Sequence, residues 1–286
     1  MHLTTSPHLR YERSFDHFDA LLLESLVPLF LLVGAWGLTS AHKMTKQAAA
    51  QKSHRVLEHW LTALFLILPV ISRRICSSFR CTGYDWSDDK AAYGFSYLKT
   101  DSSLDCTTDR YWAMFAYATA MVAVYPIGAP LVLLLLLWRY RYNLNPPFGN
   151  LSEVEVIAAR KEDPVLAEEP LTDFSMLYRP AFWWFEVYNM VRRLLLTCAV
   201  LLCRDLGETT VFVVFVAIIT LVIEQESKPY VNVFLSAFTH VCCWQILLFV
   251  LYLQLLDSGA TTGDQAIWFS AALMLANVGL IATIFM

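Results

Sequence analysis

The chain has 286 residues, of which 57% are hydrophobic, with a mean hydropathy of +0.48. Only 16% of the residues are charged and the net charge is −4, so the composition favours a polytopic membrane protein over a globular enzyme. Lys and Arg are dispersed among the polar segments, which excludes an extended nucleic-acid-binding face.

Seven apolar stretches are each about as long as a helix of roughly 20 residues that crosses a bilayer. We therefore predict an all-α fold, a polytopic transmembrane helical bundle of about seven spans. A short outer N-terminal segment, residues 1–18, precedes one transmembrane domain, residues 19–286, with an outer loop at 76–110 and an inner loop at 139–180. The predicted spans are residues 19–39, 57–75, 111–138, 181–203, 209–226, 231–256 and 264–285.

Orientation depends on the cysteines, because Lys and Arg are almost evenly divided between the two sides. A pair among Cys76, Cys81 and Cys106 would form a disulfide only on the oxidising side, which places the N-terminus outside. We expect the pair Cys81–Cys106, with Cys76 left over at the helix end. The remaining cysteines lie in predicted helices and are interpreted as small apolar fillers: Cys198, Cys203, Cys242 and Cys243.

The outer loop is rich in Gly, Tyr, Asp and Ser, shows no helical or strand period and is predicted to be a compact loop. Its acids could gather a cation, but a solvated loop balanced by basic residues is the favoured interpretation. No spacing typical of a metal site is present, and we expect no cofactor. The acids are Asp85, Asp88, Asp89, Asp101, Asp105 and Asp109.

The third span carries Pro126, Gly128 and Pro130 near its middle. Each proline removes a backbone donor, so we expect a helix kink at these residues. Freed carbonyls could coordinate a cation or act as a hinge, although most such kinks serve packing. In the inner loop, Ser152 followed by Glu155 predicts the start of a short helix, because the two side chains can form a capping box.

The fourth span contains charges that a bilayer tolerates only when they are partnered. Glu186, Asn189 and Arg193 recur at helical spacing and predict a polar stripe turned inward, with Arg192 beside it. In the first span Glu24 is expected to pair with Arg193, ahead of Glu186. Two interpretations stay open: an ion-pair network that only fixes helix packing, or an ion path, gate or voltage-responsive element.

Two further polar residues are interpreted more plainly. Glu224 closes the fifth span and is expected at the membrane interface rather than buried. His240 in the sixth span is expected to hydrogen-bond between helices rather than to bind a ligand.

A set of short motifs resembles the membrane domain of large protist and algal surface proteins, which usually carry cysteine-rich, growth-factor-like repeats outside. The motifs cover about residues 55–256 and are Tyr97-Leu98-Lys99-Thr100-Asp101, Leu104-Asp105-Cys106, Tyr125 to Pro130, Tyr178-Arg179-Pro180, Arg192-Arg193-Leu194 and Lys228-Pro229-Tyr230. The resemblance implies a membrane domain like that of transient receptor potential (TRP) channels. About 18 residues precede the first span, so no ligand-binding ectodomain is carried over.

These observations leave two functions open. As an ion channel or transport subunit, the chain would place Glu24, Glu186, Asn189, Arg192 and Arg193 around a polar path. As a non-conducting accessory or scaffold subunit, it would use the same charges only to lock helices together.

Other classes fit less well. The motifs of seven-span receptors and of rhodopsins do not occur. The motifs of nucleotide-binding and hydrolytic enzymes do not occur either, so we expect no enzyme activity. The expected partners are membrane lipids, with cations and with other membrane subunits or further copies of the chain as candidates. The expected location is the plasma membrane or an endomembrane.

Overall fold

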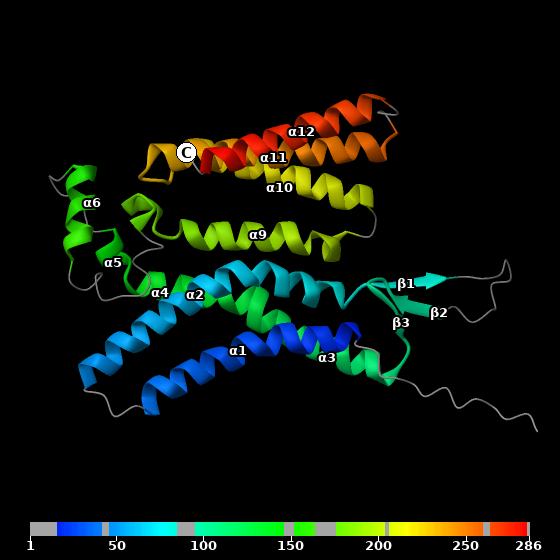
Figure 1. Cartoon of the computed structure of the whole chain (residues 1–286), viewed down its shortest axis with the longest axis horizontal. Helices are drawn as coiled ribbons and strands as arrows, with labels where there is room; N and C mark the ends of the chain where they lie inside the picture. Colours follow the sequence, from blue (N-terminus) through cyan, green and yellow to red (C-terminus); the bar gives the residue numbers. More distant parts are fainter. Residues whose placement is uncertain are drawn as a thin grey trace, which may run out of the picture.

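The fold was analysed in a computed structural model that describes residues 16–41, 46–84, 95–145, 152–163, 176–203, 206–259 and 264–284. These residues are mostly helical and include one small sheet (Figure 1). The long helices lie side by side, with the sheet at one end of the array and helix α6 at the other. We call these the sheet end and the α6 end.

One part of the molecule is a bundle built on the first half of the chain. It contains α1 (His17–Ala41), α2 (Lys46–Ser77), α3 (Asp109–Val122) and α4 (Ala129–Arg139). Apolar side chains from these helices form the largest buried core because each helix is apolar on its inward side. Fully buried members of this core are Leu21, Leu68, Ile71, Ile75, Met114 and Leu137.

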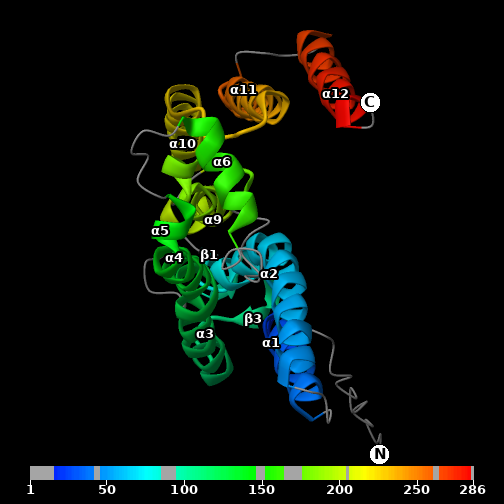
Figure 2. The same cartoon turned by 90° about the vertical axis from the view of Figure 1, so that its left-hand side faces the viewer.

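The second half of the chain is stacked on this bundle in successive layers (Figures 1 and 2). Helix α9 (Phe185–Leu202) packs on α2 and α4, α10 (Leu206–Ser227) on α9, α11 (Val233–Asp257) on α10, and α12 (Asp264–Ile284) on α11. The shorter elements are α5 (Arg141–Leu144), α6 (Glu153–Glu162) and the 3₁₀ turn η2 (Pro180–Phe182). Helix α9 therefore lies between the bundle and the outer helices.

The predicted spans coincide with helical stretches in the residues described. Three of these stretches are long and apolar enough to cross a membrane: Asp109–Arg139, Gly207–Ser227 and Val233–Leu256. Within α12, Ile267–Gly279 is a shorter apolar segment. Large apolar side chains on these helices are exposed, such as Val233 at 81% and Trp268 at 75%, which suits contact with lipid.

The prediction of an all-α chain with an irregular outer loop is wrong in one respect. Strands β1 (Cys81–Tyr84), β2 (Phe95–Leu98) and β3 (Asp101–Asp105) form an antiparallel sheet in the order β1-β2-β3. A register shift at Tyr97 and Leu98 interrupts the pairing of β2 with β3. The strands are only four or five residues long, so they leave little periodic signal in the sequence.

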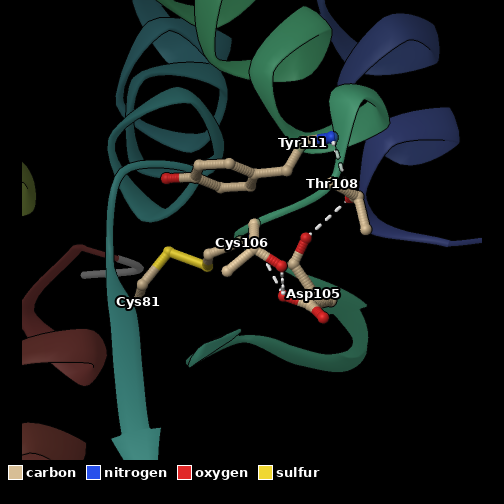
Figure 3. The surroundings of a disulfide bond; sticks show 6 residues. Cys81, Asp105, Cys106, Thr108 and Tyr111 are labelled. Carbon is tan, nitrogen blue, oxygen red and sulfur yellow. Dashed lines mark hydrogen bonds between the residues drawn. A yellow bond between two sulfur atoms is a disulfide. The ribbon is translucent and has the colours of Figure 1, made fainter. Parts of the chain in front are cut away.

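The predicted disulfide between Cys81 and Cys106 is confirmed and joins the start of β1 to the residue after β3 (Figure 3). Immediately after it, Thr108 caps α3: its Oγ1 donates to the Asp105 carbonyl at 2.7 Å and accepts from the Tyr111 amide at 3.3 Å. The disulfide and the cap thus fix the sheet to the start of α3.

The predicted distortion around Pro126 and Pro130 takes the form of a π-helical turn, η1 (Ala123–Gly128), between α3 and α4. A π turn holds one extra residue and is a recognised site of helix bending. Gly128 is required there, because a Cβ at this position would lie 2.7 Å from the carbonyl oxygen of Ala123. Beside the turn lies an apolar cavity of about 170 Å³, lined by residues that include Leu61, Phe65, Tyr125, Gly128 and Met190.

Candidate functional site

Helix α9 carries the polar residues that the sequence singled out. The chain enters it through η2, where Pro180 occupies a first-turn position that needs no backbone donor. Glu186 and Asn189 are buried, at 5% and 4% exposure, whereas Arg192 and Arg193 are partly exposed. The predicted inward stripe therefore exists, but Glu186 and Asn189 share a partner that Arg192 and Arg193 do not contact.

Tyr178 is the partner of Glu186 and Asn189. The Tyr178 hydroxyl donates to Glu186 Oε2, and Asn189 Nδ2 donates to the Tyr178 hydroxyl at 3.1 Å. Tyr178 itself is 3% exposed and its ring packs 5.5 Å from that of Phe185. The carboxylate of Glu186 thus accepts from a neutral donor, Tyr178, in the segment before α9. In the sequence, Tyr178 stood out only as part of the motif Tyr178-Arg179-Pro180.

Arg192 faces Glu224 on α10. Its Nη1 lies 3.9 Å from Glu224 Oε1 and 3.4 Å from the sulfur of Cys243 on α11. Arg192 Nε and Glu224 Oε1 are both buried without a hydrogen-bond partner in the described structure. The expectation that Glu224 is not buried is wrong, since this residue is 5% exposed and faces Arg192 between α9 and α10.

The predicted pair between Arg193 and Glu24 is wrong. The Arg193 guanidinium lies over the ring of Phe65 on α2, 4.2 Å from its centroid. Glu24 instead binds Arg74, which lies nine residues beyond Phe65 in α2. Nine residues correspond to roughly 13 Å of helix, so Arg193 and Glu24 occupy different levels along α2.

Polar contacts at the α6 end connect α6 with the segment before α9. Arg160, which is 2% exposed, donates through Nη1 to the Tyr178 carbonyl at 3.0 Å. Arg179, the residue after Tyr178, places its Nε 3.6 Å from Oε1 of Glu153 on α6. The predicted capping box between Ser152 and Glu155 is confirmed and begins α6.

The segment 177–179 pairs with the segment 229–231 at the same end. The Arg179 amide donates to the Pro229 carbonyl at 2.8 Å, and the Val231 amide donates to the Leu177 carbonyl at 3.1 Å. Tyr178 and Tyr230 form the bridge between these bonds, with their rings 5.3 Å apart. The start of α9 and the α10–α11 connection are therefore joined by backbone bonds.

A polar cavity of about 370 Å³ opens next to this pairing. Basic side chains from three segments line it, together with Glu224 and Tyr230: these are Arg179, Lys228 and His240. His240 accepts a hydrogen bond from Trp244 Nε1 at 3.1 Å, in the tautomer that leaves its Nε2 free to accept. This is a contact within α11, whereas the sequence had suggested a bond between helices.

The loop acids Asp101 and Asp105 accept hydrogen bonds within local turns, and Asp101 also accepts one from the start of α1. Asp101 accepts from the His17 amide at 2.9 Å and from Ser103 Oγ at 2.6 Å. Asp105 accepts from the amide and the hydroxyl of Thr107, each at 2.8 Å. Among the described residues no group of three potential ligands of a metal ion comes together. Asp85, Asp88 and Asp89, and most of the N-terminal segment, lie outside the described residues.

These contacts define the candidate site as the charged face of α9, with partners on α2, α10, α11 and the segment before α9. Comparison with protein-family models, with curated proteins and with solved structures finds no match to this chain.

Proposed function

We propose that the chain is a multi-pass membrane protein that acts as an ion-transport subunit with a TRP-like membrane domain. In this proposal all seven helical stretches cross the bilayer, with the sheet end outside and α6 at the inner surface. The disulfide supports an oxidising environment at the sheet end. The less apolar helices could also span the bilayer, because their charged side chains form ion pairs. Glu24 pairs with Arg74, and Arg192 pairs with Glu224.

The observation that carries the transport role is the pair of Arg192 and Glu224. Their side chains are only 14% and 3% exposed, and neither completes its hydrogen bonding. Two packed apolar residues would hold α9 to α10 at least as well, because they avoid the loss of hydration that a buried charge suffers. A charge pair that is buried with incomplete hydrogen bonding supports a role that needs the charge itself, such as gating or ion passage.

A second candidate is a non-conducting accessory subunit. The contact of Arg193 with Phe65 and the bonds of Glu186 with Tyr178 favour it, because these groups are satisfied inside the chain. The exposed apolar faces of α11 and α12 would then bind lipid or partner helices. In this case the charged face of α9 would only fix helix packing.

Ion flux distinguishes the two candidates. Purified protein in liposomes is expected to pass cations, measured separately for Na⁺, K⁺ and Ca²⁺. The double variant Arg192→Leu/Glu224→Leu should remain folded but alter that flux, whereas the matched control Arg74→Leu/Glu24→Leu should leave it unchanged. Absence of flux from folded wild-type protein would overturn the transport role and favour the accessory subunit.

Membrane topology is tested separately. Single cysteines are introduced at Ser102 on β3 and at Ser152 before α6, both of which are exposed. A membrane-impermeant thiol reagent should label position 102 from outside and position 152 only after permeabilisation. Labelling of both positions from the same side would contradict the proposed orientation.

A further inference from the structure

Two cysteines without a disulfide face each other where α2 packs on α9. The sulfur of Cys76 lies 2.8 Å from the sulfur of Cys198, although the two residues are 122 positions apart. A disulfide is about 2.05 Å long, so the sulfur atoms need to approach by less than about 1 Å to bond. We propose that Cys76 and Cys198 form a second disulfide, which joins α2 covalently to α9.

The position of the pair fits this chemistry. Cys76 is the last residue but one of α2 and precedes the disulfide-bonded Cys81 by five positions. Cys198 lies one turn before the end of α9 at Leu202. Figure 1 shows that both helices run toward the sheet end, so the pair lies near the established disulfide and on the same side of the molecule. A compartment that preserves the first disulfide also permits the second.

The environments of the two sulfurs suggest an order of reaction. Cys76 is buried at 6% exposure, whereas Cys198 is partly exposed. A small-molecule disulfide, such as glutathione disulfide, is the oxidant. The Cys198 thiolate attacks it, forming a mixed disulfide and releasing one thiol; the Cys76 thiolate then attacks the Cys198 sulfur and releases the second thiol. The two protein thiols are oxidised, and one molecule of disulfide is reduced to two thiols.

The bond would restrain the candidate site. Helix α9 already contacts α2 where Arg193 lies over Phe65, and Cys198 follows Arg193 by five residues. A covalent link at the sheet end would hold α9 against α2 at a second point. In the oxidised protein α9 would be held to α2 by a covalent bond as well as by packing, whereas reduction leaves the packing alone. This inference concerns a modification and does not depend on whether the protein conducts ions.

Thiol mapping tests the proposal. The full chain in detergent is treated with glutathione disulfide, blocked with N-ethylmaleimide, digested without reduction and analysed by mass spectrometry. We expect a cross-linked peptide that contains Cys76 and Cys198 and is lost after treatment with dithiothreitol, while Cys242 on α11 remains alkylated. Recovery of both thiols as alkylated peptides, or of Cys76 joined to Cys81 or Cys106, would overturn the proposal.

Two variants test the order of reaction. In Cys76→Ser, Cys198 should accumulate as the glutathione mixed disulfide, because the resolving thiol is missing. In Cys198→Ser, Cys76 should stay free, because it is buried. Glutathione on Cys76 and none on Cys198 would reverse the order. The cross-link itself is judged on wild-type protein, so a variant that fails to fold does not affect that result.

Discussion

Arg74 on α2 binds both carboxylate oxygens of Glu24 on α1: its Nε donates to Oε2 at 3.1 Å and its Nη2 donates to Oε1 at 2.7 Å. Such two-point contacts between guanidinium and carboxylate are among the stronger ion pairs in proteins. They also fix the relative level of α1 and α2, because each partner is anchored to its own helix.

A double-mutant cycle should detect this pair. Replacing Arg74 or Glu24 by Leu leaves the other charge alone, so the two changes should be non-additive, with a coupling free energy of about 1–2 kcal/mol in thermal unfolding. The cycle of Arg193→Leu with Glu24→Leu is the matched control and should be additive. Coupling in the control cycle instead would restore the pair that the sequence had suggested.

Gly128→Ala should destabilise the π turn. The added Cβ would meet the Ala123 carbonyl oxygen at 2.7 Å, so the backbone has to shift. We expect a loss of about 1–3 kcal/mol in the free energy of unfolding. Gly34→Ala in α1 is the control, because a Cβ there meets no atom within 4 Å. Equal stability of the two variants would show that the turn tolerates the methyl group.

The pair of Arg192 and Glu224 should also respond to single and double replacement. Glu224→Leu leaves the Arg192 guanidinium, on a side chain that is 14% exposed, without its acid and should cost about 3 kcal/mol, whereas the double variant with Arg192→Leu should recover most of that loss. The control Glu226→Leu changes an exposed acid on the same helix and should shift stability by about 0.5 kcal/mol at most. Thermal unfolding in detergent is measured for wild type, both single variants, the double variant and the control, and simple addition of the two single effects would argue against the pair.

Asp105 should make stability depend on pH. The two hydrogen bonds from Thr107 hold the pKa of its carboxylate below the ordinary value of 3.8. A folded-state pKa below the unfolded one stabilises the protein above pH 3.8, and this contribution is lost as the pH falls through the folded-state pKa. Between pH 5 and pH 2, roughly the range that brackets such a titration, wild type should lose more stability than Asp105→Asn. Identical pH profiles would contradict this assignment.

The helices and the first disulfide could be predicted because their signals are local. Long apolar runs specify α3 with α4, α10 and α11 through length and hydropathy alone. Pro126 and Pro130, with Gly128 between them, predict a distortion of the helix because each proline lacks a backbone donor. Cys81 and Cys106 lie in one loop, so they had few partners to choose from.

The charge partners could not be predicted, because pairing depends on the level of each residue along a neighbouring helix. Arg74 lies at the end of the second predicted span, residues 57–75, but the sequence does not show that α2 packs so as to bring it level with Glu24. Tyr178 gave no periodic signal, since it lies in a connection and reaches Glu186 only after η2 turns the chain. The contact of Cys76 with Cys198 likewise depends on how α2 packs on α9.

The backbone pairing of Leu177–Arg179 with Pro229–Val231 makes two separate helix starts one mechanical unit. The first of these segments leads directly into η2 and α9, and the second ends two residues before α11. A displacement of the start of α11 would therefore displace the start of α9 or break these bonds, and α6 is linked to the same bridge because Arg160 donates to the Tyr178 carbonyl. The short bridge thus couples the position of the start of α9 to that of the start of α11.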